Sequence, residues 1–138
     1  MERIDCICFN LRRAARTTSR YYDAVLAPLG LRNTQFSVLA VLTQLGPTPI
    51  SQLAEVMAME RTTLTRNLKP LERDDLVEQT VGEDRRQRIV QLTGTGKKTF
   101  AKAKKLWQEA NDSAGQLLGE TRTKRLLGDL KATAARLS

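Results

Sequence analysis

The sequence predicts a mainly α-helical chain that contains one small β-hairpin, and three observations lead to this fold class. Residues 59–73 place leucines at helical spacing on one side, which indicates an amphipathic helix. A shorter apolar helix over residues 50–57 precedes it, separated by a brief turn. Residues 76–81 and 89–92 have the pattern of two strands joined by an Arg-rich turn. This order of helix, turn, helix and hairpin is typical of a winged helix-turn-helix domain.

The helix over residues 59–73 has two chemically different faces. Its apolar stripe consists of Leu64, Leu68 and Leu71. The opposite face combines hydroxyl groups near the N-terminal end with cations, and its members are Thr62, Thr65, Arg66, Lys69 and Arg73. Hydroxyl groups and Arg can reach base edges in a DNA major groove, while Lys and Arg neutralise phosphates. A solvated surface helix would show the same polarity, so the flanking helix and hairpin decide in favour of DNA binding.

The composition restricts the function further. The 138 residues carry 23 Lys and Arg against 15 Asp and Glu, a net charge of +8, which favours a polyanionic partner such as nucleic acid or an anionic membrane surface. Aromatic residues are only 4% of the chain, which argues against a base-stacking single-strand binder. The sequence has no apolar run near the ~20 residues that span a bilayer and no signal-peptide pattern. We therefore expect a cytoplasmic protein with no membrane partner.

Histidine is absent from the chain. Its absence removes the usual general base and the commonest metal ligand, and a Cys or Ser nucleophile would lack its customary partner. We therefore expect no enzymatic activity, no cofactor and no metal site.

We expect a single domain over residues 1–138, in which residues 31–93 form the winged helix DNA-binding part. Residues 5–29 and 96–138 are expected to form N- and C-terminal dimerisation helices. Apolar residues keep helical spacing in both segments, yet so small a monomer offers them little to pack against. We therefore expect a homodimer, and a monomer in sedimentation at micromolar concentration would contradict it.

Local signals predict the helix starts. Asp5, Asn33, Ser51 and Thr93 are the expected N-caps of four helices, because their side chains can accept hydrogen bonds from the free N–H groups there. Pro70 removes one N–H from the helix over residues 59–73. It predicts a bend rather than an end, because the apolar stripe continues beyond it.

The segment Gly94–Thr99 looks like the end of a phosphate-binding loop. That pattern requires Gly at position 91 and Ser or Thr at position 98, where this chain has Gln91 and Lys98. We therefore interpret the segment as a strand-to-helix turn and reject nucleotide binding.

With these features in place, the chain resembles the MarR family of bacterial regulators over nearly its whole length. The residues that carry the resemblance are Gln52–Ala54, Thr62–Leu71, Leu76–Val77, Asp84–Arg86 and Leu92–Thr93. The resemblance implies a winged helix-turn-helix homodimer with interlocked terminal helices, bound to a pseudo-palindromic operator with the recognition helix in the major groove. It also implies that Arg86 enters the minor groove, held by Asp84, since a narrow minor groove concentrates negative potential. The family usually has Gly at the position of Asp75, where it allows a left-handed backbone that Asp tolerates less well.

We therefore predict a sequence-specific regulator of transcription, in the first instance a repressor, that binds double-stranded DNA. Base reading is assigned to Thr62, Thr65 and Arg66, and phosphate contact to Thr63, Lys69 and Arg88. The other expected DNA-binding residues are Ser51, Arg61, Asp84, Arg85 and Arg86. Three alternatives remain: a regulator controlled by a small aromatic ligand between the first and fifth helices, a non-specific architectural DNA protein, and a thiol enzyme. The missing histidine argues against the last of these.

Cys6 and Cys8 stand at the start of the first helix. Residues two apart point to different sides of a helix, so a disulfide between them would require the helix end to unwind. Some members of the MarR family carry a reactive cysteine on the first helix, and the matching hypothesis is a redox switch in which oxidation releases DNA. The alternatives are that Cys8 packs as a small core residue while Cys6 is incidental, and that four thiols of a dimer hold a metal.

Overall fold

The computed structural model describes residues 4–138, and it confirms a mainly helical winged helix-turn-helix fold. The elements in chain order are α1 (Ile7–Leu26), the short 3-10 helix η1 (Ala27–Leu29), α2 (Asn33–Leu45), β1 (Thr48–Pro49), α3 (Ile50–Val56), α4 (Arg61–Arg73), β2 (Val77–Val81), β3 (Arg88–Leu92), α5 (Gly94–Leu118) and α6 (Glu120–Leu137).

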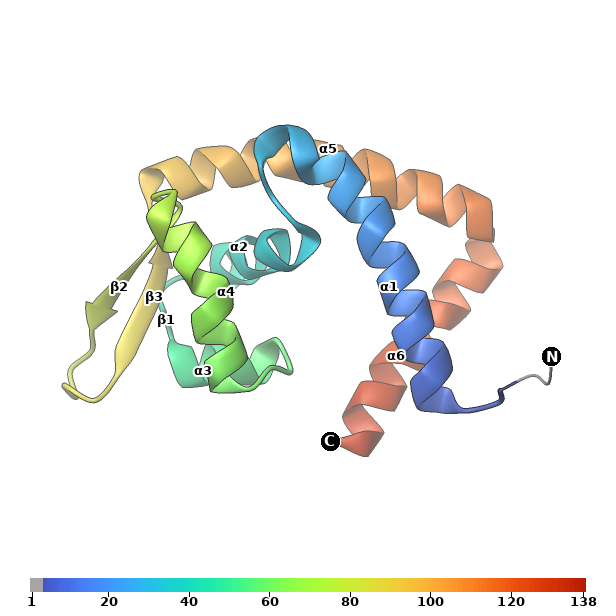
Figure 1. Cartoon of the computed structure of the whole chain (residues 1–138), viewed down its shortest axis with the longest axis horizontal. Helices are drawn as coiled ribbons and strands as arrows, with labels where there is room; N and C mark the ends of the chain where they lie inside the picture. The colour runs from blue at the N-terminus through green and yellow to red at the C-terminus, as the bar shows by residue number, and fades with distance from the viewer. Residues whose placement is uncertain (1–3) are drawn as a thin grey trace.

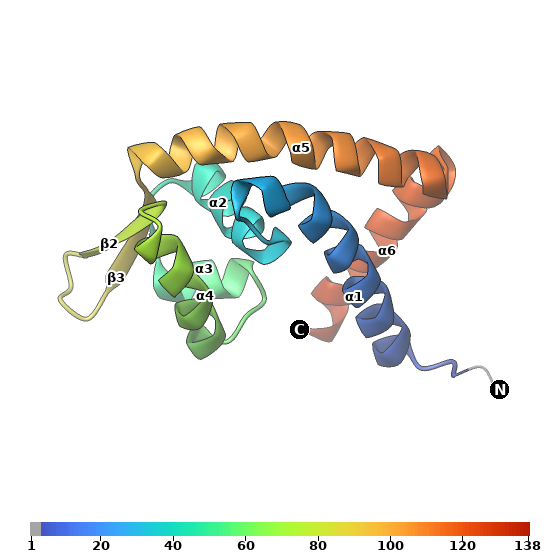
Figure 2. The same ribbon diagram turned by 45° about the horizontal axis from the view of Figure 1, so that its top comes forward.

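The elements are arranged along α5, the long helix that crosses the top of the molecule in both ribbon views (Figures 1 and 2). The helices α2, α3 and α4 and the sheet lie below one end of α5, while α1 and α6 lie below the other end. Both α4 and α5 pack against α2, which connects the two parts of the molecule. Helix α4 and the wing therefore lie at one end of the long helix α5.

The wing is a three-stranded antiparallel sheet in the order β1-β3-β2. In the hairpin, Val77 pairs with Leu92 and Val81 with Arg88, which confirms the predicted strands to within one residue at each end. Strand β1 was not predicted. It is only two residues long and includes a proline, so its sequence is typical of a simple helix stop. Thr48 of β1 lies opposite Val90, and its buried hydroxyl donates to the carbonyl oxygen of Gly46 at 2.8 Å.

The hydrophobic core fills the space between the winged elements and α5. All three leucines of the predicted α4 stripe are buried at 0–1% exposure. On the other side of the core, the ring of Phe36 stacks on Phe100 and Trp107, with ring centroids 5.4 and 5.6 Å apart. These stacked rings fix α2 against α5 and so hold the winged part on that helix.

The N-cap of α5 is Thr93, as predicted, and its hydroxyl oxygen accepts the N–H of Gly96 at 2.9 Å. The predicted N-cap Asp5 is wrong by one residue. The cap of α1 is Cys6, whose sulfur accepts the N–H of Phe9 at 3.5 Å. Thiol sulfur is a weaker acceptor than a carboxylate, so cap preference alone favoured the aspartate.

The predictions for Asn33 and Ser51 are also wrong by one or two residues. Asn33 is the first residue of α2 rather than its cap, and its side chain and backbone N–H both donate to Asp23 Oδ1 at 2.7 Å. Asp23 on α1 thus supplies the cap from another helix, which local sequence signals could not indicate. Helix α3 begins directly after Pro49, so Ser51 lies in its first turn.

No single helix in residues 4–138 is long and apolar enough to cross a membrane. Taken together, the segments Ile7–Leu29 and Asn33–Leu45 have the length and apolar composition of a membrane span, but the chain bends by 76° between them.

Candidate nucleic-acid interface

The turn between α3 and α4 covers residues 57–60 and sets where α4 begins. Ala58 has a left-handed backbone with φ of +51°, which is uncommon for a residue with a Cβ. Two backbone hydrogen bonds hold it there: the N–H of Ala58 donates to the Glu55 carbonyl at 3.1 Å, and that of Met59 to the Ala54 carbonyl at 2.9 Å. Helix α4 therefore begins at Arg61, two residues later than predicted.

Helix α4 turns its leucines into the core and its polar face to solvent. Five exposed side chains on that face line a shallow groove, and they are Arg61, Thr62, Thr65, Arg66 and Lys69. The Thr65 hydroxyl donates to the Arg61 carbonyl at 2.8 Å, which leaves its oxygen free to accept another hydrogen bond. The structure thus brings five of the predicted DNA-binding residues together. Thr63 is exposed on the same helix, and Ser51 is exposed on α3.

Helix α4 continues past Pro70 to Arg73, so the proline does not end it, as predicted. The chain then reverses at Asp75, whose φ of +57° is the left-handed conformation expected at this position. Just after it, the N–H of Leu76 donates to the carbonyl of Leu71 at 2.8 Å. This tight exit sends the chain directly from α4 into the wing.

A side-chain contact also joins α4 to the wing. The amide of Gln79 on β2 donates a hydrogen bond to the carboxylate of Glu72 on α4. No local pattern indicates this pair, because the two residues face each other only after the chain has reversed. The contact contributes to a fixed angle between the helix and the hairpin.

The wing tip is held by three hydrogen bonds from backbone N–H groups, one of which the Asp84 side chain accepts. Asp84 Oδ1 accepts the backbone N–H of Arg86 at 3.0 Å, and its own carbonyl accepts the N–H of Gln87 at 2.8 Å. The N–H of Gly82 closes the loop on the Gln87 carbonyl at 3.0 Å. Asp84 therefore orders the backbone of Arg86 and does not pair with its guanidinium. The side chains of Arg85, Arg86 and Arg88 are all exposed.

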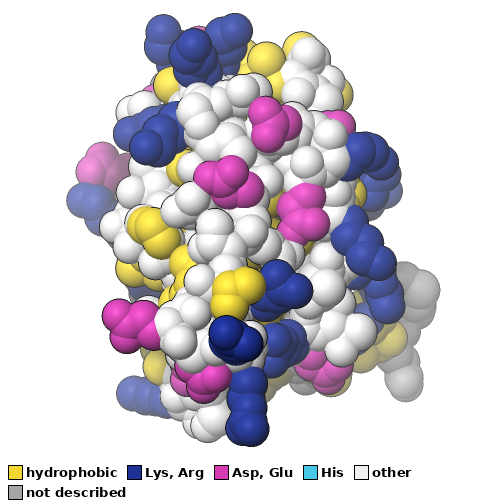
Figure 3. Space-filling model, turned by 90° about the vertical axis from the view of Figure 1, so that its left-hand side faces the viewer, with side chains coloured by type: hydrophobic (Ala, Val, Ile, Leu, Met, Phe, Trp, Pro, Cys, Tyr) yellow, Lys and Arg dark blue, Asp and Glu magenta, His cyan; other side chains and the backbone are white. Residues whose placement is uncertain are grey.

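Apart from Arg73, the cations of α4 and the wing form no ion pair with any residue that the structure describes. In residues 4–138 the only ion pairs within 4 Å are Arg73 with Asp74 and Lys124 with Glu120. Figure 3 shows Lys and Arg side chains along the right-hand edge and at the lower end of the side that carries the wing, with acidic side chains between them. These unpaired cations can therefore meet an external anion.

A compact junction connects the end of α4, the end of the wing and the start of α5. The Thr93 hydroxyl donates to the Asp75 carbonyl at 2.5 Å, and the Thr93 N–H donates to the Leu76 carbonyl at 3.1 Å. A Cβ on Gly96 would lie 1.9 Å from that same Leu76 oxygen. Sequence reasoning missed this role of Gly96, since it interpreted Gly94–Thr99 as a strand-to-helix turn; that interpretation is wrong, because α5 begins directly at Gly94 after the Thr93 cap. The repeated glycines were the available signal of a close backbone approach.

Both cysteines are free and exposed. Cys6 lies outside α1 with extended backbone angles, and Cys8 is the second residue of the helix. Within one chain Cys8 does not pack in the core, so the interpretation of Cys8 as a core residue fails for the single chain.

A helix-turn-helix with exposed hydroxyls and cations on its second helix, followed by a basic three-stranded wing, defines the winged helix-turn-helix class. Residues 31–87 match the model of the MarR family. The chain is 39% identical, over the matched residues, to MosR, a transcriptional regulator of Mycobacterium tuberculosis crystallised in complex with DNA. That match covers 96% of this chain and 98% of MosR with a TM-score of 0.84. The chain therefore belongs to the MarR family, a family of transcriptional regulators and not of enzymes.

Two further relatives agree with this assignment. CouR, a transcriptional repressor solved bound to a 23-mer DNA duplex, is 30% identical, with 94% of this chain and 93% of CouR covered and a TM-score of 0.85. YwoH of Bacillus subtilis, an uncharacterized HTH-type transcriptional regulator, is 32% identical over 90 residues, which are 65% of this chain. The matched part is 66% of the length of YwoH.

Proposed function

We propose that this protein is a transcriptional repressor that binds double-stranded DNA in a sequence-specific manner. The observation that carries the proposal is the exposed groove on α4, where three cations and two threonines converge beside an unpaired Arg-rich wing. MosR and CouR, both solved with DNA, support it.

In this proposal α4 enters the major groove. Thr62, Thr65 and Arg66 read base edges, because hydroxyls and guanidinium groups can match their donors and acceptors. Thr63, Lys69 and Arg88 contact phosphates. Arg86 enters the minor groove from a tip that Asp84 has already ordered, and Ser51, Arg61 and Arg85 complete the interface.

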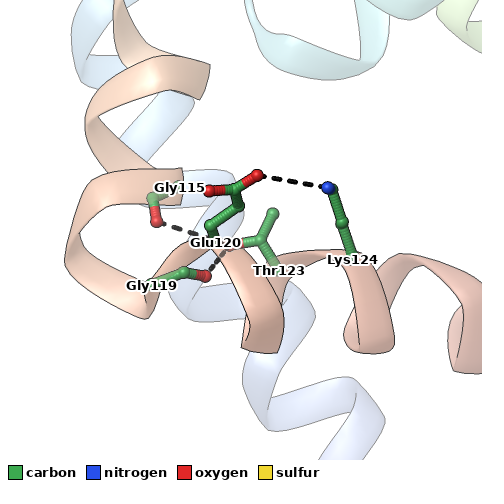
Figure 4. A network of polar contacts seen from close by, with 5 residues as sticks. All are labelled: Gly115, Gly119, Glu120, Thr123 and Lys124. Carbon is green, nitrogen blue, oxygen red and sulfur yellow. Dashed lines mark hydrogen bonds and ion pairs between the residues drawn. The ribbon is translucent and has the colours of Figure 1, made fainter.

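We further propose that the repressor is a homodimer on a pseudo-palindromic operator. Large apolar residues are left exposed at the start of α1 and along α6, among them Ile7 at 69% and Leu127 at 52%. The corner between α5 and α6 fixes the direction of α6. The Thr123 hydroxyl on α6 contacts the Gly115 carbonyl on α5 at 3.4 Å and donates to the Gly119 carbonyl at the corner at 2.7 Å, while Lys124 pairs with Glu120 within α6 at 3.1 Å (Figure 4). A second chain would cover this apolar surface, and two recognition helices would then read two half-sites.

Sedimentation measures the oligomeric state directly. We expect a dimer at micromolar concentration, whereas a monomer would contradict the proposed assembly.

The test of DNA binding is a gel shift on the DNA upstream of the protein's own gene, with excess random competitor. A complex that survives the competitor supports a specific regulator. Binding that random DNA removes completely would favour a non-specific architectural protein instead.

A second candidate property is control by thiol oxidation, and the position of the cysteines favours it. Cys6 already lies outside the helix and both thiols are exposed, so little helix has to unwind before the two sulfurs can meet. A disulfide there would replace the Cys6 cap of α1 and alter the start of a proposed dimerisation helix. We expect hydroperoxide to weaken the gel-shift complex and thiol reductant to restore it. A Cys8→Ser protein that still responds to peroxide would exclude Cys8 from the switch.

A further inference from the structure

Helix α5 carries cations that the proposed α4 and wing interface does not use. Residues 85–108 contain no Asp or Glu and eight cations, three Arg of the wing and five Lys of α5. Outside residues 85–108, the other 15 Lys and Arg are equal in number to the 15 Asp and Glu. The net charge of +8 therefore comes entirely from this segment. The five lysines are all exposed, and they are Lys97, Lys98, Lys102, Lys104 and Lys105.

Three of these lysines form one ridge. At about 100° per residue, Lys98, Lys102 and Lys105 lie within roughly 60° of one another around the helix. They are on the side turned away from the buried Gly96 and Ala103. Because α2 packs against both α4 and α5 and lies between them in both views (Figures 1 and 2), this lysine ridge faces away from α4. A straight duplex on α4 therefore does not reach it.

The lysine ridge gains little from interactions within the chain. Lys98 and Lys102 are like charges at i,i+4, which destabilise a helix. Glu109 is four residues from Lys105, yet in residues 4–138 the ridge takes part in no ion pair within 4 Å. An external polyanion would supply the missing negative charge.

We infer that the lysine ridge binds the phosphate backbone of a second DNA duplex. The inference rests on the proposed function, since the first duplex is the one held by α4. Seven residue steps of helix spread the three ammonium groups over about 10 Å, which is about three phosphate-to-phosphate steps along one strand. The ridge itself consists of lysines alone, so it contacts backbone without reading sequence. A protein with one duplex on α4 and another on α5 bridges two DNA segments.

The test is a bridging assay on the full-length protein. The upstream duplex is fixed to beads and saturated with protein, the beads are washed, and a labelled duplex of random sequence is added. The variant Lys98→Gln/Lys102→Gln/Lys105→Gln is compared with Arg125→Gln/Lys131→Gln/Arg136→Gln, which removes three exposed positive charges from α6 instead. We expect beads that carry the ridge variant to retain at least about five-fold less labelled DNA than beads that carry the wild type. The amount of protein that stays on the beads should be within two-fold of the wild-type amount. The slope of log binding against log salt should fall by up to ~2.7, or ~0.9 for each phosphate that the variant no longer neutralises.

Three results would overturn the inference: no labelled duplex retained by the wild type, an equal loss in the α6 control, or a parallel loss of protein from the bead-bound duplex. The last would assign the lysines to the first interface. Failure of the wild type to stay on the beads overturns the proposed function as well, and it is seen before the second duplex is added.

Discussion

The winged part and the terminal helices use their apolar residues in opposite ways. Between α2 and β3, large residues such as Leu39, Leu68 and Val90 are 0% exposed. On the terminal helices Ile7 is 69% and Leu127 is 52% exposed. Burial of apolar area is what stabilises a fold. The winged part buries its core within one chain, although Leu45, Val56 and Val81 on its surface are 46%, 52% and 53% exposed, whereas α6 buries none of its large apolar residues. Under the proposed homodimer, the second chain covers those residues of α6.

The sharpest test of this difference compares two leucines. Leu68→Ala should lower the free energy of unfolding by ~2–5 kcal/mol at every protein concentration, because it leaves a cavity in a closed core. Leu127→Ala should instead weaken the dimer, so that its melting temperature falls mainly at low protein concentration. Urea unfolding at two concentrations separates the two effects. Equal behaviour of the variants would contradict the division into a closed part and an open part.

The junction that joins the two parts offers a matched pair of glycines. A Cβ on Gly96 would lie 1.9 Å from the Leu76 carbonyl oxygen, whereas a Cβ on Gly94 has no atom within 4 Å. We expect Gly96→Ala to destabilise the fold by ~1–3 kcal/mol, the usual cost of overpacking, and Gly94→Ala to be close to neutral. Thermal unfolding measures both. If the two variants lost the same stability, steric contact at the junction would not be the cause.

The sequence predicted some of these features well because their signals are local. The α4 stripe, the hairpin and the Thr93 cap each depend on residues a few positions apart, and each is confirmed. The cap that Asp23 provides for α2 and the pairing of Gln79 with Glu72 depend on contacts between elements, so no local pattern indicates them. For the site, the periodicity of α4 was enough to place its groove residues on one face, while the role of each one in DNA binding stays a prediction.

A smaller effect is expected on the exposed face of the winged part, where substitutions should change binding and leave the fold intact. Arg66→Ala should weaken specific DNA binding by ~1–3 kcal/mol and relax sequence choice, since Arg66 is proposed to read a base. Lys69→Ala should weaken all sequences alike and lower the salt slope by ~1. Gel shifts on specific and random duplexes at several salt concentrations distinguish the two. Identical behaviour of the two variants would show that the assigned roles are wrong.

The smallest effect concerns Tyr22, at the contact between α1 and α5. Its hydroxyl donates to Asn111 Oδ1 at 2.8 Å. Burial, and secondly the neighbouring Tyr21, raise the pKa of Tyr22 above its ordinary value of 10.0. The folded state therefore prefers the neutral phenol, so its contribution to stability is complete below pH 10 and is lost as the pH rises from 10 through the raised pKa.

Tyr22→Phe cannot ionise, so its stability should fall less between pH 10 and 11 than that of the wild type, although it lacks the hydrogen bond at neutral pH. Urea unfolding across this pH range measures the difference. Because Tyr22 is partly exposed, solvent screens the effect and the difference in slope should be small. A variant that loses stability as steeply as the wild type would place the alkaline sensitivity in another group.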